Sequence, residues 1–148
     1  KRTHLLFSLE SLTNLARNGR VNPAVAKIAG VLGIRVVGCA SEEGTLQQLH
    51  KCRGEKKALE TLFQEMKERG FIGGRTRIAH CFNPEAASKL KEAILAAFPK
   101  CDIHIEPATA LCSFYAEAGG LIIGFEGGFC CLKKSINTVS NIPHLNRE

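Results

Sequence analysis

The stretch from residue 5 to residue 39 constrains the fold more than any other part of the chain. Its apolar pattern predicts a strand, an amphipathic helix, a basic Gly-Arg turn, a nearly all-apolar helix and a second strand, in that order. The apolar helix, over residues 23–32, follows an Asn-Pro pair that is typical of a helix start, and Lys27 is its only charge. A helix without a polar face must be covered on several sides.

Two kinds of partner could bury the apolar surface of this helix. One is a lipid-sized apolar ligand, because small residues leave room for hydrocarbon and each buried CH₂ contributes about 0.8 kcal/mol. The other is protein, with the helix simply packed between the sheet and a neighbouring domain. In the first case we expect the groove to be lined by Ala26, Ala29, Gly30 and Leu32.

The remaining patterns interleave helices and strands without a regular β-α-β repeat. Strands are predicted at Ile34–Ala40, 45–50, 77–82, 101–106 and 121–125, and helices at 55–69 and directly after Asn83-Pro84. Ser8 is expected to cap the first helix, and residues 108–120 to form a loop. Because the first two of these strands read as a hairpin, we expect an α/β two-layer sandwich, with helices packed on a mixed or antiparallel sheet.

Composition excludes several classes of partner and site. The formal charge is +6, but one Tyr and no Trp leave few aromatic platforms for single-stranded nucleic acid, so we expect no nucleic-acid partner. Seven cysteines without a CxxC pair favour a reducing cytosol and disfavour a zinc site. No run approaches the roughly 20 apolar residues of a transmembrane helix. We therefore expect a cytoplasmic protein with no transmembrane segment, metal or cofactor.

Three segments carry a resemblance to a known family: FSLESLTNLARNGRVNP at residues 7–23, the strand that begins at Ile34, and KCRGEKKA at 51–58. Together they resemble the C-terminal lobe of DegV-family fatty-acid-binding proteins, the acyl-carrying subunits of bacterial fatty acid kinase. The resemblance extends through the strand at 121–125. We therefore divide the chain into a DegV-like lobe, 1–126, and a tail of unknown role, 127–148.

The resemblance implies that the chain and an absent N-terminal lobe enclose a long-chain fatty acid and present its carboxylate to a partner kinase, without chemistry of their own. On this hypothesis the isolated chain binds acyl chains weakly or not at all. In most DegV-like proteins a histidine in a Thr-His-x-Gly-Pro-Gly stretch helps to hold the carboxylate, but residues 108–120 lack that motif. Cys112 and Ser113 stand about where Thr-His would be, and we expect the hydroxyls of Ser113 and Tyr115 to bind the carboxylate instead. An ordinary polar connection would have the same composition.

A basic set of residues is the second candidate site. Lys56 and Lys57 fall in the first turn of a predicted helix, where cations oppose the helix dipole, and a broken local rule of this kind often marks function. The resemblance implies that the arginines of the two matching segments, Arg20 and Arg53, face the kinase. A solvated cationic patch would explain the same residues.

Two other functions stay open at this point. The chain is alternatively a ligand-free interaction domain that docks an acidic partner through Arg20 and Arg53. Less favoured is a cysteine-dependent enzyme, in which Cys112 is the nucleophile and His80 or His104 lies within hydrogen-bonding reach.

Overall fold

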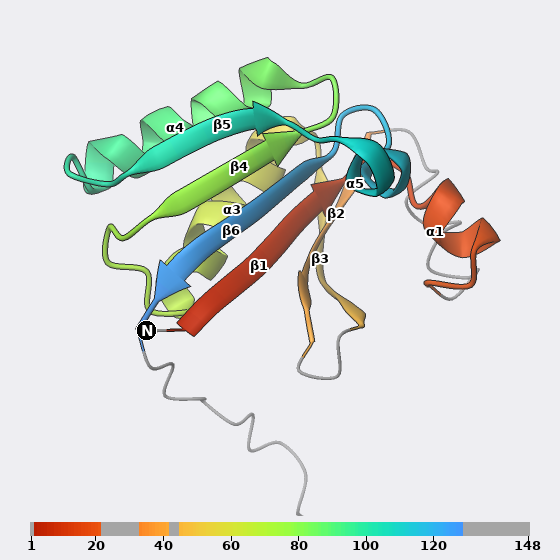
Figure 1. Cartoon of the computed structure of the whole chain (residues 1–148), viewed down its shortest axis with the longest axis horizontal. Coiled ribbons are helices and arrows are strands. Elements are labelled where there is room, and N and C mark those ends of the chain that lie inside the picture. The colour runs from red at the N-terminus through yellow and green to blue at the C-terminus, as the bar shows by residue number, and fades with distance from the viewer. Residues whose placement is uncertain (1, 22–32, 42–44, 129–148) are drawn as a thin grey trace, which may run out of the picture.

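The computed structural model describes residues 2–21, 33–41 and 45–128. The described part of the chain forms a six-stranded sheet with the strand order β3-β2-β1-β6-β4-β5 (Figure 1). The strands are β1 (Arg2–Leu9), β2 (Ile34–Ala40), β3 (Leu46–Arg53), β4 (Thr76–His80), β5 (Ile103–Pro107) and β6 (Leu121–Gly127). Only β4 and β5 pair in parallel, and every other neighbouring pair is antiparallel. The predicted mixed sheet of an α/β fold is confirmed.

Two long helices, α3 (Glu55–Glu68) and α4 (Pro84–Ala97), pack side by side on one face of this sheet. The helix α4 starts where the Asn-Pro pair predicts, since the Asn83 side chain accepts a hydrogen bond from the Ala86 N–H at 3.3 Å. The larger core lies between these helices and the sheet. Its fully buried side chains include Leu62, Met66, Ile78, Leu90, Ile94 and Ile123.

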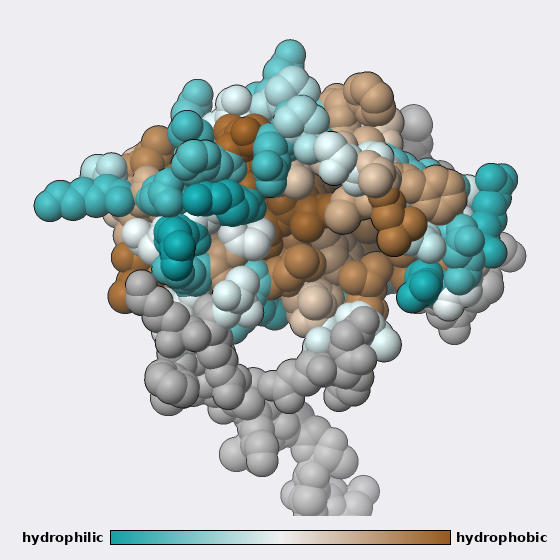
Figure 2. All heavy atoms as spheres, viewed as in Figure 1, coloured by the Kyte–Doolittle hydropathy of each residue, from teal (hydrophilic) through white to brown (hydrophobic). Residues whose placement is uncertain are grey.

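The opposite face of the sheet carries a smaller apolar cluster. Along β1, Leu6 joins the larger core while Phe7 and Leu9 belong to this second cluster, as the two-residue period of a strand requires. Two short helices, α1 (Thr13–Arg17) and α5 (Ala110–Ala116), lie at one end of this face and contact each other. Figure 2 shows apolar side chains gathered in the middle of the face, with hydrophilic ones to either side.

Two local predictions are wrong. Ser8 does not cap a helix, because β1 pairs with both β2 and β6 as far as Ser8, and its side chain is buried in the sheet. The helix α1 begins later, after Leu12, without a side-chain cap. Residues 108–120 are not all loop, since they contain α5, which is too short to show a helical period in the sequence.

The predicted apolar helix over residues 23–32 lies outside the described residues. The groove lining by Ala26, Ala29, Gly30 and Leu32 therefore stays a prediction. The same holds for the tail, of which the structure describes only Gly127, at the end of β6, and Gly128. In the described segments, no helix combines the length and the hydropathy needed to cross a bilayer.

Candidate functional site

An apolar hollow of about 550 Å³ lies on the sheet face opposite α3 and α4. Its floor comes from β1 and β6, and its sides from β3, α1 and α5. A smaller hollow of about 210 Å³ adjoins it, sharing Phe7, Leu15 and Leu46. Pockets for small molecules usually measure about 300–1,000 Å³ and are lined mainly by apolar side chains. The larger hollow therefore has the size and the chemistry of a ligand site.

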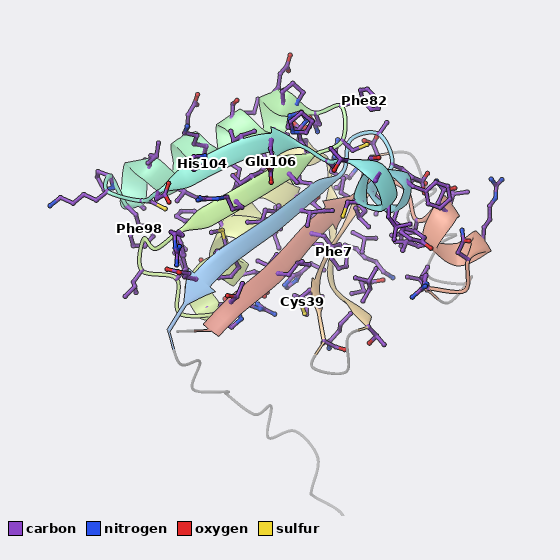
Figure 3. The ribbon with its side chains drawn as sticks, viewed as in Figure 1. Phe7, Cys39, Phe82, Phe98, His104 and Glu106 are labelled. Carbon is purple, nitrogen blue, oxygen red and sulfur yellow. The ribbon has the colours of Figure 1, made fainter. Side chains whose placement is uncertain are left out.

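The floor of the hollow depends on a glycine. Phe7 of β1 pairs with Gly38 of β2 on one side and with Ile122 of β6 on the other. A Cβ atom at residue 38 would overlap the Phe7 ring and the Gln47 carbonyl oxygen. The ring therefore lies over Gly38, close to the backbone of the sheet, and lines the hollow; Figure 3 labels Phe7.

The helix α5 forms one side of the hollow and is hydrogen-bonded to α1. Ala110 at its start and Glu117 just after its end have φ angles of 46° and 52°, in the left-handed region that non-glycine residues rarely adopt. Two hydrogen bonds join α5 to α1: the Asn14 N–H donates to Glu117 Oε1, and Asn14 Nδ2 donates to the Phe114 carbonyl, each at 2.8 Å. Strained residues of this kind persist where the surrounding structure imposes them, often at ligand sites.

Three polar or reactive side chains line the hollow at this end: Arg20, Cys112 and Tyr115. Gly19, with a φ of 66°, makes the turn after α1, and the Arg20 N–H donates to the Leu15 carbonyl at 2.8 Å. Within the described segments, the Tyr115 hydroxyl makes no hydrogen bond. A guanidinium and a hydroxyl are both suited to an anion, since charge-assisted hydrogen bonds are the strong ones.

Ser113 does not line the hollow. Its hydroxyl donates to the Ala110 carbonyl at 2.8 Å, within α5 itself. The four cations predicted to bind the partner lie at two different places. Arg20 lines the hollow. The other three are exposed where β3 meets α3: Arg53, Lys56 and Lys57.

The chain resembles known proteins in sequence and in fold. A model for a family of uncharacterised proteins, DegV, matches residues 1–126. The chain belongs to the DegV family. A DegV domain-containing protein of Streptococcus pyogenes is 44% identical over 126 residues, which is 85% of this chain and 45% of that protein. The chain thus spans less than half the length of the curated relatives that it matches.

Solved DegV structures share the fold. A Eubacterium eligens DegV protein loaded with heptadecanoic acid superposes with a TM-score of 0.82 at 46% identity, covering 85% of this chain and 46% of that chain. The Streptococcus pneumoniae fatty acid kinase (Fak) B3 protein, loaded with linoleic acid, gives a TM-score of 0.82 at 45% identity, covering 84% of this chain and 44% of that chain.

Sequence reasoning on this DegV chain missed a polar network beside the sheet end. Glu55 accepts hydrogen bonds from Asn83 at 3.1 Å and Lys89 at 3.2 Å, and forms an ion pair with Arg35 at 3.4 Å. Burial by itself raises the pKa of Glu55, but the bonds from Asn83 and Lys89 and the charges of Arg35 and Lys89 outweigh it, so the pKa lies below its ordinary value. The one signal of this network in the sequence is Glu55 itself, an acidic residue in the first turn of a predicted helix.

The described part of this DegV chain does not bring together the cysteine and histidine of the alternative enzyme. No histidine there hydrogen-bonds to Cys112, and His80 Nδ1 instead accepts from the Asn83 N–H at 3.4 Å. No group of three or more potential metal ligands occurs among the same residues.

Proposed function

We propose that this chain forms one wall of a binding site for a long-chain fatty acid, which the part of the DegV protein beyond this chain completes. The observation that carries the proposal is the apolar hollow of about 550 Å³ on the sheet. Two DegV relatives of the same fold are loaded with heptadecanoic acid and linoleic acid, which supports an acyl ligand. Each CH₂ placed in the hollow contributes about 0.8 kcal/mol, so a sixteen-carbon chain has ample driving force.

The carboxylate of the acid is proposed to lie at the α1–α5 end of the hollow. Tyr115 donates a hydrogen bond to it, and Arg20 supplies a positive charge. Cys112 lies beside them in the lining. Ser113 takes part only if its hydroxyl leaves the Ala110 carbonyl, to which it now donates.

We further propose that the intact protein presents this carboxylate to a fatty acid kinase and has no catalytic role or cofactor of its own. The relation to the Fak B3 protein supports such a partner. The exposed cations Arg53, Lys56 and Lys57, with Arg20 at the rim of the hollow, supply positive charge for docking. The intact protein here means this chain together with whatever part of the protein it does not span.

Native mass spectrometry of the intact protein tests the acyl ligand. We expect the added mass of a long-chain fatty acid, and palmitate or oleate binding by calorimetry after the lipid is removed. Leu111→Asp, which places a charge in the hollow, should abolish the adduct. Ile72→Asp is the matched control, because Ile72 is exposed and lies outside the hollow. Absence of both adduct and binding in the wild type would refute the proposal.

Charge reversal separates docking from lipid binding. Arg53→Glu should greatly reduce phosphorylation of the bound acid while the intact protein keeps its lipid, because Arg53 does not line the hollow. Arg20→Glu should reduce both. Undiminished turnover of the Arg53→Glu protein would show that this arginine does not face the kinase.

A further inference from the structure

Phe82, the last residue of the predicted strand 77–82, lies outside β4, which ends at His80, and combines two unfavourable features. Its side chain is 89% exposed, and its φ angle of 50° lies in the left-handed region. Figure 3 shows it projecting away from the sheet, beyond the end of β4. An exposed aromatic side chain contributes no hydrophobic burial energy to folding. A residue with a Cβ atom is also strained at this φ. Folding of the described structure therefore gives no reason for phenylalanine at this position.

The residues on both sides of Phe82 are held firmly. The Cys81 N–H donates to the Gly120 carbonyl, and the Gly119 N–H donates to the Cys81 carbonyl, each at 2.9 Å. On the other side, Asn83 caps α4 and donates from Nδ2 to Glu55. These bonds hold the backbone on both sides of Phe82, and strain that the surroundings impose in this way is typical of functional positions.

Charges of both signs lie near Phe82: Glu55 is paired with Arg35 and Lys89, Glu85 is exposed, and several exposed cations are present as well. The contact between Asn83 and Glu55 places Phe82 beside the start of α3, whose neighbouring residues Arg53, Lys56 and Lys57 are exposed. Within the described ranges, neither Arg53 nor Lys56 forms an ion pair, and Lys57 reaches Glu60 only at 3.9 Å. An aromatic side chain with cations around it is the composition of a docking surface for an acidic protein.

We propose that Phe82 is the aromatic anchor of the kinase-docking surface, inserting into an apolar pocket on an acidic face of the kinase while Arg53 and Lys56 pair with its carboxylates. The inference rests on the proposed function and names a residue that the basic pattern alone did not reveal. The local charge favours an acidic occupant over a second copy of the same surface, because the exposed Arg53 and Lys56 of two copies would repel each other. Aromatic residues, Phe among them, are enriched at protein interfaces.

Surface plasmon resonance between the intact, oleate-loaded protein and the purified kinase subunit of a fatty acid kinase tests the anchor. Phe82→Ala and Phe82→Gly should each weaken binding at least about tenfold. Phe82→Gly should unfold at the same or a higher temperature than the wild type, because glycine tolerates the positive φ. Ile72→Ala is the matched control: Ile72 is 82% exposed, precedes the other end of β4, and should bind like the wild type.

The outcomes separate this inference from the proposed function. Kinase binding that is equal in wild type and Phe82→Ala overturns the anchor and leaves the proposed function standing. No binding by the wild type overturns the kinase partner and the anchor together. If Phe82→Ala unfolds at a lower temperature than the wild type in the absence of kinase, the Phe82 ring is buried within the intact protein. A wild-type dimer that Phe82→Ala dissociates would make the surface a self-association site. Either of these results also overturns the proposal.

Discussion

The two faces of the sheet use the same strands for different purposes. Ile122 and Ile123 are neighbours in β6, but Ile123 is fully buried in the core with α3 and α4, whereas Ile122 lines the hollow. On the helix-covered face the apolar side chains are sealed. On the hollow face Leu5 and Leu46, at 40% and 37% exposure, retain accessible surface. One face of the sheet therefore holds the larger sealed core, and the other is available for a ligand.

The largest expected effect is a loss of stability on the sealed face. Leu62→Ala removes a fully buried side chain of α3 and should lower the free energy of unfolding of the intact protein by about 2–5 kcal/mol. Leu46→Ala on the hollow face, the matched control, should cost less than about 1 kcal/mol in lipid-free protein. Urea unfolding measures both. Equal losses would erase the distinction between the faces.

Two glycines sharpen the comparison within the hollow face. Gly38→Ala should destabilise the intact protein by about 1–3 kcal/mol, because the added methyl group overlaps Phe7 and the Gln47 carbonyl. Gly124→Ala should change stability by no more than about 0.5 kcal/mol, because a Cβ there meets nothing within 4 Å. Thermal unfolding of the lipid-free variants checks the pair, and a reversed order would show that Phe7 does not lie over Gly38.

The joint between α1 and α5, formed by the hydrogen bonds of Asn14 to Phe114 and Glu117, should control lipid release. Asn14→Ala removes the side-chain bond to the Phe114 carbonyl and should cost about 0.5–1.5 kcal/mol of stability. It should also speed the dissociation of oleate, measured by stopped-flow transfer to an acceptor protein. Asn18→Ala is the control, because among the described residues the Asn18 side chain bonds only to the Asn14 carbonyl in the same turn. Identical oleate release from both variants would refute a role for the joint.

Acid should produce the smallest effect, confined to the sheet end beside α3. The pKa of Glu55 is lower in the folded state than in the unfolded chain, so its contribution is complete above the unfolded value of about 4.3 and is lost as the pH falls through the folded pKa. Glu55→Gln should therefore flatten the acid limb of stability against pH below about pH 4.5. Glu60→Gln, at an exposed position of α3, is the control. Unchanged acid limbs in both variants would contradict this assignment.

The features that sequence predicted are those with local signals. The continuous apolar run of β6, the Asn83-Pro84 start of α4 and the turn at Gly19 needed only neighbouring residues. The cap assigned to Ser8 failed because pairing with two strands outweighed a local capping pattern. The helix α5 was missed because bonds from Asn14, about a hundred residues earlier, help to hold it in place.

The candidate site was only partly predictable for the same reason. Cys112 and Tyr115 were predicted at the ligand and line the hollow, although their contact with a ligand stays a prediction. No local pattern distinguishes Arg20 at the hollow from Arg53 outside it, because the turn at Gly19 and the position of α5 decide the difference. The exposure of Phe82 depends likewise on distant residues, because the preceding residue, Cys81, forms hydrogen bonds with Gly119 and Gly120.

The most direct test of the account uses the two neighbouring isoleucines of β6. With ¹³C-labelled isoleucine methyl groups in the intact protein and palmitate bound, nuclear Overhauser effects should connect the acyl methylenes to the Ile122 methyl group. None should reach Ile123, which faces the sealed core. Contacts from palmitate to Ile123, or to neither isoleucine, would show that the acyl chain does not occupy the hollow face.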